Sequence, residues 1–390
     1  MLKIGVLVNL RPNVGGSYQY WMTLLGALSK LHDKYDVFVI YENIEWKSIA
    51  DNLGIKSVRY YRKKKSFCSL IIERLFWKYK STFFRKCLCY LTYNFDNIKK
   101  IGLNVIFADS AMGIPELLKI RTIIPIHDLM HRYERDVPEM EEGYEYRENL
   151  YKNEVTRADL ILVDSKIGAK HVVESYGDIC DGLSDKIAVL PFIAPPYIYA
   201  DTKDKCPPVD LPEKYIFYPA QFWSHKNHIR LLNALAKLKN QEIIVNLVCV
   251  GSEQNNSGII KSRLQSLNLL DQVYILEYVS NEEIVFLYKH ARALVMPTLL
   301  GPTNIPPLEA FALGCPVITS GIYAIPEQLG DAAIYFNPRS EDEIAECIRR
   351  VWLDDKLCDD LIERGKKHVK QWGPEQFADT LKMILREHYE

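Results

Sequence analysis

Short apolar runs alternate with longer amphipathic stretches along most of the chain. Helical spacing predicts helices between the apolar runs of the first half, such as Tyr18–Lys30, Glu145–Arg157 and Lys166–Ser175. Apolar strands separated by helices are typical of a parallel sheet that is covered on both faces. The predicted strands of the first half are Ile4–Leu10, Asp36–Tyr41, Leu103–Ala108, Ile123–His127, Leu160–Asp164 and Ile187–Leu190.

A second series of the same kind starts after a proline-rich stretch, at the apolar run Tyr215–Tyr218. We therefore expect an α/β protein with two doubly wound, Rossmann-like domains that face a central cleft, where ligands bind at the carboxyl ends of strands. The expected boundaries are a first domain over 1–200, a linker over 201–213, a second domain over 214–372 and a final helix over 373–390. The second series comprises the helices Ile229–Lys239, Ile259–Leu267, Asn281–His290 and Glu341–Trp352, and the strands Ile243–Gly251, Val273–Leu276, Ala293–Met296, Val317–Thr319 and Ala333–Phe336.

Composition indicates an ordinary globular protein. The chain has 390 residues, 48% hydrophobic and 25% charged, with a formal net charge of −1, so no overall attraction to nucleic acid follows. Nine cysteines without a CxxC pair favour reduced thiols in the cytoplasm. No apolar run reaches the length of a membrane span, and the amino-terminal run indicates a strand rather than a signal peptide.

Charge is unevenly distributed, and the basic excess lies in residues 56–100. This segment carries thirteen Lys or Arg residues against Glu73 and Asp96, interleaved with aromatic residues. Such a pattern suggests a surface that lies on an anionic membrane or binds a phosphorylated lipid. Nucleic acid is the competing partner, and a solvated basic helix face is the simplest alternative. The residues expected in the patch are Arg62, Lys63, Lys64, Lys65, Trp77 and Lys78.

The stretch from Gly301 to Ser320 is expected to be a polar loop, a helix and a short buried strand. Pro306 and Pro307 suit the first helical positions, where a missing N–H is no loss. The unpaired N–H groups at such a helix start can bind an anion. Glu309 then falls in the first turn, where it either caps the helix or holds a ligand. The simple alternative is an ordinary helix start with a first-turn acid.

Three other polar positions follow predicted strands. The Gly15-Gly16 pair permits close approach of a phosphate or sugar, although the pattern is not GxGxxG and a plain turn is the alternative. In the His127-Asp128 pair, Asp128 either caps a helix or orients the imidazole. Lys226, in a loop before a helix, can pair with a diphosphate or be merely solvated.

These residues carry a family resemblance. The segment from Tyr218 to His228, followed by Gly301–Ala310, resembles the retaining GT-B glycosyltransferases, most of all glycosyltransferase family 4 in the branch used for bacterial surface polysaccharides. The resemblance covers nearly the whole chain. It implies an acceptor-binding first domain, a second domain that binds a nucleotide-sugar donor, and a last helix that crosses back to the first domain. Further matching segments are Gly15-Gly16, Leu160–Ser165, Ile325–Glu327, Gly330–Pro338 and Trp372–Phe377.

The resemblance also implies roles for individual residues. The catalytic set is His127, which contacts the donor sugar, Lys226, which neutralises the diphosphate, and Glu309, which binds the ribose hydroxyls. Two positions depart from the family: Gln221 replaces a diphosphate-binding arginine, and Gly301 replaces a sugar-binding acid. The donor-binding residues are expected to be Gly15, Gly16, Gln221, Tyr278, Val279, Thr303, Asn304, Ile305 and Glu309.

The implied reaction is retaining transfer of a hexosyl or deoxyhexosyl unit from a nucleotide-diphosphate sugar, with a GDP-mannose-like donor favoured. The acceptor is a glycan or lipid-linked glycan of a cell-surface polysaccharide such as O-antigen, lipopolysaccharide or capsule. We expect no cofactor and no metal, and a cytoplasmic protein that is peripheral on the inner membrane face. A non-catalytic GT-B subunit of a glycan-assembly complex and a GT-B sugar-nucleotide epimerase are the alternatives.

Overall fold

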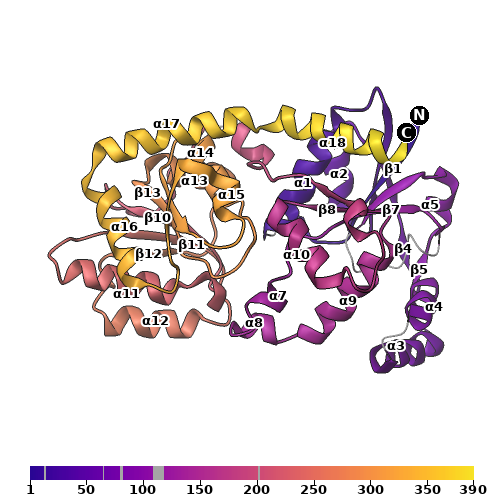
Figure 1. The fold of residues 1–390 in the computed structure, drawn as a ribbon, viewed down its shortest axis with the longest axis horizontal. Coiled ribbons are helices and arrows are strands. Elements are labelled where there is room, and N and C mark those ends of the chain that lie inside the picture. Colours follow the sequence, from indigo (N-terminus) through magenta and orange to yellow (C-terminus); the bar gives the residue numbers. More distant parts are fainter. Residues whose placement is uncertain (13–14, 65, 80–81, 109–117, 201–202) are drawn as a thin grey trace. The chain divides into compact units, whose positions relative to one another are not determined.

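The computed structural model describes residues 1–12, 15–64, 66–79, 82–108, 118–200 and 203–390 (Figure 1). The chain forms two compact units, each built around one parallel sheet. The first unit contains 1–127, 145–190 and 377–390, and the second contains 128–144 and 191–376. Residues 191–200, which the sequence placed with the first domain, pack in the second unit because Ala194 and Ile198 belong to its core.

The first unit holds a seven-stranded parallel sheet with the order β3-β2-β1-β6-β7-β8-β9. Successive strands are added on one side from β1 to β3 and on the other side from β6 to β9. The topological switch point therefore lies between β1 and β6. Its strands are β1 (Leu2–Val8), β2 (Tyr35–Tyr41), β3 (Lys56–Arg59), β6 (Val105–Ala108), β7 (Arg121–Pro125), β8 (Leu160–Val163) and β9 (Ile187–Val189).

Helices surround this sheet, and the last one ties the carboxyl terminus to it. Tyr35 of β2 donates a hydrogen bond to Glu390, and the Arg121 guanidinium lies over the Tyr389 ring at 4.3 Å. The helices are α1 (Gly15–Ser29), α2 (Glu45–Asn52), α3 (Phe67–Tyr79), α4 (Thr82–Thr92), α5 (Asp96–Ile101), α9 (Tyr144–Arg157), α10 (Lys166–Tyr176) and α18 (Pro374–Tyr389), of which α18 begins in the second unit.

The basic segment 56–100 is more varied than its sequence pattern predicts. It begins with the edge strand β3, whose sequence Lys-Ser-Val-Arg has a single apolar residue. A two-stranded antiparallel sheet, β4 (Tyr61–Arg62) with β5 (Tyr93–Asn94), then closes a hairpin of α3 and α4, which pack against each other (Figure 1).

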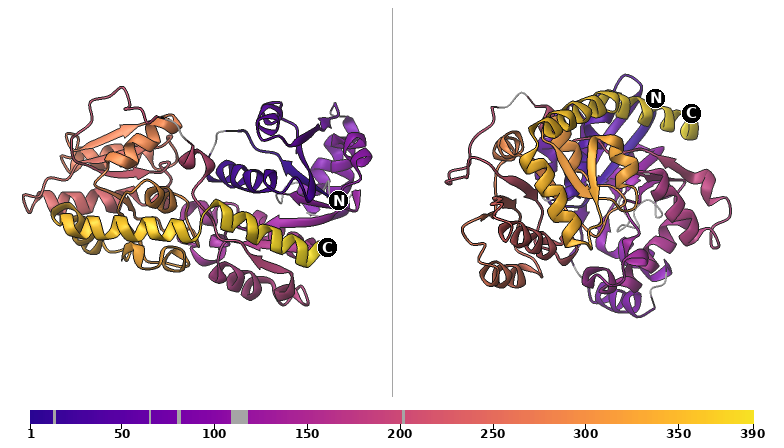
Figure 2. Two further views of the ribbon diagram at one scale, coloured as in Figure 1. Left: turned by 90° about the horizontal axis from the view of Figure 1, so that it is seen from above. Right: turned by 60° about the vertical axis from the view of Figure 1, so that its left-hand side comes forward.

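The second unit holds a six-stranded parallel sheet with the order β12-β11-β10-β13-β14-β15, and its switch point lies between β10 and β13. Figure 2 shows both sheets from two further directions, each flanked by helices. The prediction of two doubly wound, Rossmann-like parallel sheets is confirmed. The strands are β10 (Ile216–Pro219), β11 (Leu247–Val250), β12 (Val273–Leu276), β13 (Ala293–Met296), β14 (Val317–Ser320) and β15 (Ala333–Phe336).

Two apolar cores cover the faces of this second sheet. One core joins α11 and α16 to the sheet through residues such as Leu231 and Ile348, and the other joins α13 and α14 through Tyr288 and Phe311. The helices of the unit are α11 (His228–Lys239), α12 (Ser257–Ser266), α13 (Asn281–His290), α14 (Pro306–Ala312), α15 (Ile325–Leu329), α16 (Glu341–Leu353) and α17 (Asp355–Gln371).

Residues 128–144, here called the strap, follow β7 in sequence and end at the first residue of α9, and they pack in the second unit. The strap contains two short helices, α7 (Met130–Tyr133) and α8 (Pro138–Glu141). Its apolar residues share one buried cluster with residues that follow β13 and β14. The members of that cluster are Met130, Val137, Met140, Leu299 and Leu300, with Tyr323 packed against them.

Candidate functional site

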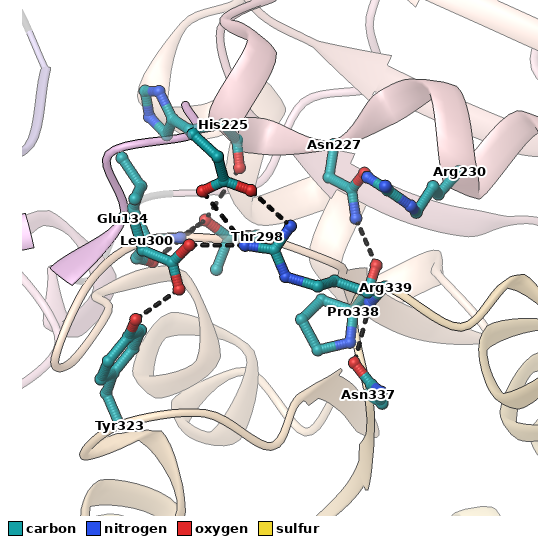
Figure 3. Close-up of polar contacts among 11 residues, drawn as sticks. Glu134, His225, Asn227, Arg230, Thr298, Leu300, Tyr323, Asn337, Pro338 and Arg339 are labelled. Atoms are coloured by element: carbon teal, nitrogen blue, oxygen red, sulfur yellow. Dashed lines mark hydrogen bonds and ion pairs between the residues drawn. The ribbon is translucent and has the colours of Figure 1, made fainter. Parts of the chain in front are cut away.

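Lys226 sits in a tight turn after β10, at the carboxyl edge of the second sheet. The Tyr218 hydroxyl donates to the carbonyl oxygen of Lys226 at 2.8 Å. The next residue, Asn227, is buried with φ of +61°, and its amide donates to the carbonyl oxygens of Pro297 and Pro338 at 2.8 and 2.7 Å (Figure 3). Asn227 therefore ties together the loops that follow β10, β13 and β15, and this fixes the turn that carries Lys226.

The Lys226 side chain is half-buried in this turn. Burial lowers its pKa, and the negative charge of Asp128 acts in the opposite direction. The Asp128 carboxylate also accepts a hydrogen bond from the Met130 N–H, at the first residue of the short helix α7, at 3.0 Å. The role of Asp128 in orienting the His127 imidazole stays a prediction. A lysine whose positive charge is poorly solvated gains most from an anionic ligand.

Glu309 lies in the first turn of α14 and is buried, with 7% of its surface exposed. The Tyr197 hydroxyl donates to its Oε1 at 2.7 Å, and the Tyr288 hydroxyl donates to its Oε2 at 2.7 Å. Burial raises the pKa of Glu309, whereas the hydrogen bonds from Tyr288 and Tyr197 partly lower it. Both carboxylate oxygens are thus held in place, and each keeps a further lone pair that can accept a ligand hydroxyl.

The loop before α14 is shaped by Gly301, whose φ is +104°. A Cβ atom there would lie 2.8 Å from Nδ2 of Asn304 and 2.9 Å from the carbonyl oxygen of Thr303. The Asn304 backbone is paired with the Gln328 side chain in both directions, at 2.9 Å each. Its Nδ2 atom is buried and has no hydrogen-bond partner among the described residues, so it is a donor available to a ligand. Thr303 is buried, and Ile305 is half-buried.

Gln221 provides neutral contacts where the family resemblance implies a cation. Its Oε1 accepts a hydrogen bond from the Trp223 indole, and its Nε2 donates to Ser252, both at 3.0 Å. Tyr278 and Val279 follow β12. Tyr278 is 85% exposed, whereas Val279 packs against the core. The exposed Tyr278 ring is accessible to a nucleotide base, a role that stays a prediction.

The first unit holds the remaining predicted site residues. Gly15 and Gly16 open α1, both are exposed, and Gly15 has a φ of +70°, which favours glycine. His127 follows β7 and is half-buried, and its ring packs edge-on against Tyr20 with the ring centres 4.4 Å apart. These three residues lie at the carboxyl ends of β1 and β7. The structure thus groups Lys226, Glu309 and Thr303–Ile305 in one unit and these three in the other.

Several residues around the site carry no sequence signal. Tyr197 and Tyr288 are 112 and 21 positions away from Glu309, and either reads as a core aromatic residue. Asn227 is the exception: it stands beside Lys226 in the motif, so its position could have suggested its role. The carboxylates of the strap, described below, have partners far away in the sequence.

The predicted lipid patch is only partly described. Arg62, Lys63 and Lys64 are exposed, whereas Lys65 and the side chains of Trp77 and Lys78 lie outside the described residues. Arg62 pairs with Glu42 at 2.7 Å, and the Lys63 ammonium lies over the Tyr90 ring at 4.8 Å. Large apolar side chains on α3 and α4 are exposed as well: Phe67, Leu70, Ile71, Phe83 and Tyr90.

Among the described residues, no group of three or more His, Cys, Asp or Glu side chains has the arrangement of a metal site. No described helix combines the length and the apolar character that crossing a bilayer requires.

The two parallel, Rossmann-like sheets place the chain in the GT-B fold class of glycosyltransferases. The family model for group 1 glycosyl transferases matches residues 201–368, which include Lys226 and Glu309. The match covers most of the second unit, whose sequence is similar to the group 1 glycosyl transferases, also called glycosyltransferase family 4.

Similar proteins agree with this family. The chain is 28% identical over 289 residues to the O-antigen chain mannosyltransferase RfbU of Salmonella typhimurium, covering 73% of each chain. Among solved structures, it is similar to a glycosyltransferase from Rickettsia africae, with a TM-score of 0.70, 16% identity and coverage of 100% and 99%. It is also similar to Anabaena HepE, solved in complex with UDP and glucose, with a TM-score of 0.68, 13% identity and coverage of 99% and 100%. These last two likenesses show the fold.

Proposed function

We propose that this glycosyltransferase moves a mannosyl or related hexosyl unit from a nucleotide-diphosphate sugar, with GDP-mannose favoured, onto a glycan or lipid-linked acceptor of a cell-surface polysaccharide. The observation that carries the proposal is the half-buried Lys226, in a turn that Asn227 fixes at the carboxyl edge of the second sheet. The preference for mannose is supported by the similarity to the mannosyltransferase RfbU.

Lys226 is proposed to stabilise the charge that develops on the leaving nucleotide diphosphate. A fixed cation is most effective where water is scarce, because the interaction is then less screened. Glu309, held by Tyr197 and Tyr288, is proposed to accept hydrogen bonds from the ribose hydroxyls. The Asn304 amide donor and Thr303 contribute to donor binding, and His127 contacts the donor sugar near the reacting carbon.

Retention of anomeric configuration is proposed to follow a same-face route. The acceptor hydroxyl attacks the anomeric carbon from the side that the diphosphate leaves, and its proton passes to a phosphate oxygen of the leaving group. Determining the anomeric configuration of the product by NMR tests this step, and an inverted linkage excludes it. Unchanged turnover in the presence of EDTA is the result expected for a metal-independent reaction.

Nucleotide binding tests the function directly. A ligand at 100 times its Kd stabilises a protein by ~2.7 kcal/mol, so thermal-shift measurements with GDP, UDP and dTDP should identify the donor base. Slow hydrolysis of the matching sugar nucleotide should then follow. Lys226→Met should abolish hydrolysis, whereas the control Lys367→Met, at an exposed position of α17, should leave it unchanged. Absence of binding to every nucleotide would exclude the proposal.

A non-catalytic GT-B subunit is the second candidate. It is favoured by two observations, the neutral contacts of Gln221 and the lack of space for a side chain at Gly301. Such a subunit would bind a nucleotide sugar without hydrolysing or transferring it. An epimerase, the further alternative, would change the configuration of the sugar while it is still attached to the nucleotide, which NMR of the donor pool detects.

The α3–α4 hairpin is proposed to contact an anionic membrane at the cytoplasmic face. Exposed apolar side chains such as Phe67 and Phe83 can enter the headgroup region, while Lys63 and Lys64 meet the anionic lipid surface. Flotation with phosphatidylglycerol vesicles should recover the wild type but less of the Lys63→Glu/Lys64→Glu/Lys65→Glu variant. Lys366→Glu/Lys367→Glu/Lys370→Glu on α17 is the charge-matched control. Equal recovery of all three proteins would contradict the proposal.

A further inference from the structure

The strap lies over the carboxyl edge of the second sheet. Its side chains contact residues in the loops that follow five of the six strands of this sheet. Ligands of open parallel sheets bind at this edge. Glu139 meets Ser224 after β10 and Asn255 after β11. The strap's apolar residues share a cluster with Leu299 and Leu300 after β13, and Glu134 and Asp136 meet Tyr323 after β14 and Arg339 after β15.

An ion-pair cluster fixes one end of the strap. The Arg339 guanidinium contacts Glu134 at 2.6 Å and Asp136 at 2.9 Å, and the Tyr323 hydroxyl donates a hydrogen bond to Glu134 (Figure 3). The hydrogen bond from Arg339 lowers the pKa of Asp136. Because two carboxylates bind the same guanidinium, the position of the Arg339 side chain is better defined than in an isolated surface ion pair.

Glu139 connects the strap to the turn that carries Lys226. Its Oε1 atom accepts hydrogen bonds from the Ser224 N–H at 2.7 Å and from the Asn255 amide at 3.0 Å, and it lies 3.7 Å from Nδ1 of His225. The Glu139 side chain is only 10% exposed. Burial raises its pKa, but the hydrogen bonds to the carboxylate and the nearby His225 outweigh this effect, so the pKa lies below its usual range.

The turn from Ser224 to Lys226 is therefore held from two directions. Asn227 binds the turn to the loops after β13 and β15. The Glu139 carboxylate accepts the hydrogen bond of the Ser224 N–H at the start of the turn, and that of Asn255 in the loop after β11. A carboxylate that accepts a backbone N–H makes a strong, directional hydrogen bond. A small rotation of this turn would move the Lys226 ammonium, because Lys226 is the last residue of the three-residue turn that begins at Ser224.

We propose that Glu139 is a positioning residue for the donor diphosphate, acting through the Ser224–Lys226 turn, and that the Arg339 cluster holds the strap in the place this requires. The inference rests on the proposed function, because it assigns Lys226 to the diphosphate. It adds an acidic residue from outside the family motifs to the donor site, and it gives the strap a role in donor binding.

Paired ligands with and without phosphates test this role. Glu139→Ala and Glu139→Gln are compared with Glu346→Gln, a control carboxylate on α16 that pairs with Arg349. Calorimetry measures Kd for GDP and guanosine, or for UDP and uridine if the wild type prefers them. Glu139→Ala should raise Kd for the diphosphate at least tenfold and for the nucleoside less than threefold. Glu139→Gln, which keeps a neutral acceptor for the Ser224 N–H, should lie between wild type and Glu139→Ala.

Every other result decides against the inference. Equal losses for diphosphate and nucleoside would indicate a general structural role, unchanged Kd values would show that Glu139 does not position the turn, and tighter diphosphate binding would show that it competes with the ligand. If Glu139→Ala does not fold, Arg339→Met releases the strap from its other end, and a change of less than threefold in diphosphate Kd overturns the proposal. A wild type that binds none of these ligands instead refutes the proposed function itself.

Discussion

The Tyr288 hydroxyl donates a hydrogen bond to Oε2 of Glu309 at 2.7 Å, and it does so from α13, within the core below α14. The Tyr197 hydroxyl, in the 191–200 segment of the same unit, donates a hydrogen bond to the other carboxylate oxygen. The buried carboxylate is therefore oriented before any ligand arrives, and this reduces the ordering required when a ribose binds.

Tyr288→Phe should weaken both stability and donor binding. The substitution removes one hydroxyl donor and leaves Oε2 of the buried Glu309 without this hydrogen bond, which costs about 1–3 kcal/mol. Chemical denaturation should show that loss, and calorimetry should show weaker binding of the nucleoside as well as the nucleoside diphosphate, because the ribose is common to both. A loss confined to the diphosphate would contradict the assignment of Glu309 to the ribose.

Gly301→Glu restores the acid that the family carries, yet it should not improve the enzyme. A Cβ atom at this position would lie 2.9 Å from a backbone oxygen of Thr303, and the φ of +104° is unfavourable for any L side chain. We expect a stability loss of about 1–3 kcal/mol and no gain in donor affinity. Gly301→Ala separates the two effects, since it introduces the steric strain without the charge. Donor affinity that rises with Glu alone would contradict this prediction.

Gly251→Ala should destabilise the second unit through a different contact. A Cβ atom on Gly251, after β11, would clash with the carbonyl group of Ala220 and the backbone nitrogen of Gln221, after β10. The two loops would have to separate, at a cost of about 1–3 kcal/mol or more. Gly258→Ala in α12 is the matched control, since its Cβ would meet no atom within 4 Å and should stabilise the helix slightly. Similar urea midpoints for the two variants would contradict the prediction.

The two sheets could be predicted because their buried strands are continuous apolar runs, such as Ala293–Met296. The site residues that the sequence suggested lie in local motifs where a loop enters a helix, as at Lys226 and Glu309. Their assigned roles stay predictions.

Other features could not be predicted, because their stability depends on distant partners. The sequence of the strap is typical of a charged, solvated stretch. Its partners are distant in sequence: Ser224 lies 85 positions from Glu139, and Arg339 lies 205 positions from Glu134. Strand β3 was missed for a related reason. It is an edge strand with only Val58 as an apolar residue, so its pairing with β2 defines it rather than its pattern.

His228 should make the second unit sensitive to acid. Its ring is 2% exposed and lies between Tyr218 and Phe222, with ring centres 4.8 and 4.9 Å away. Burial, together with the charges of Lys226 and His225, lowers its pKa to about 3. Because the folded pKa lies below the unfolded value of 6.5, the neutral ring stabilises the fold above pH 6.5, and this contribution is lost as the pH falls toward 3.

His228→Phe should therefore flatten the dependence of stability on pH. One pH unit in this window corresponds to about 1.4 kcal/mol for a single group, so the wild type should lose about 2–3 kcal/mol more than the variant between pH 6.5 and pH 4.5. Urea denaturation at both values measures this difference, with His32→Phe, at an exposed position of the first unit, as the control. Glu309 acts in the opposite direction, since its raised pKa favours the fold at low pH, so comparing His228→Phe/Glu309→Gln with Glu309→Gln alone isolates the histidine. Equal losses in wild type and His228→Phe would show that His228 does not set the acid sensitivity.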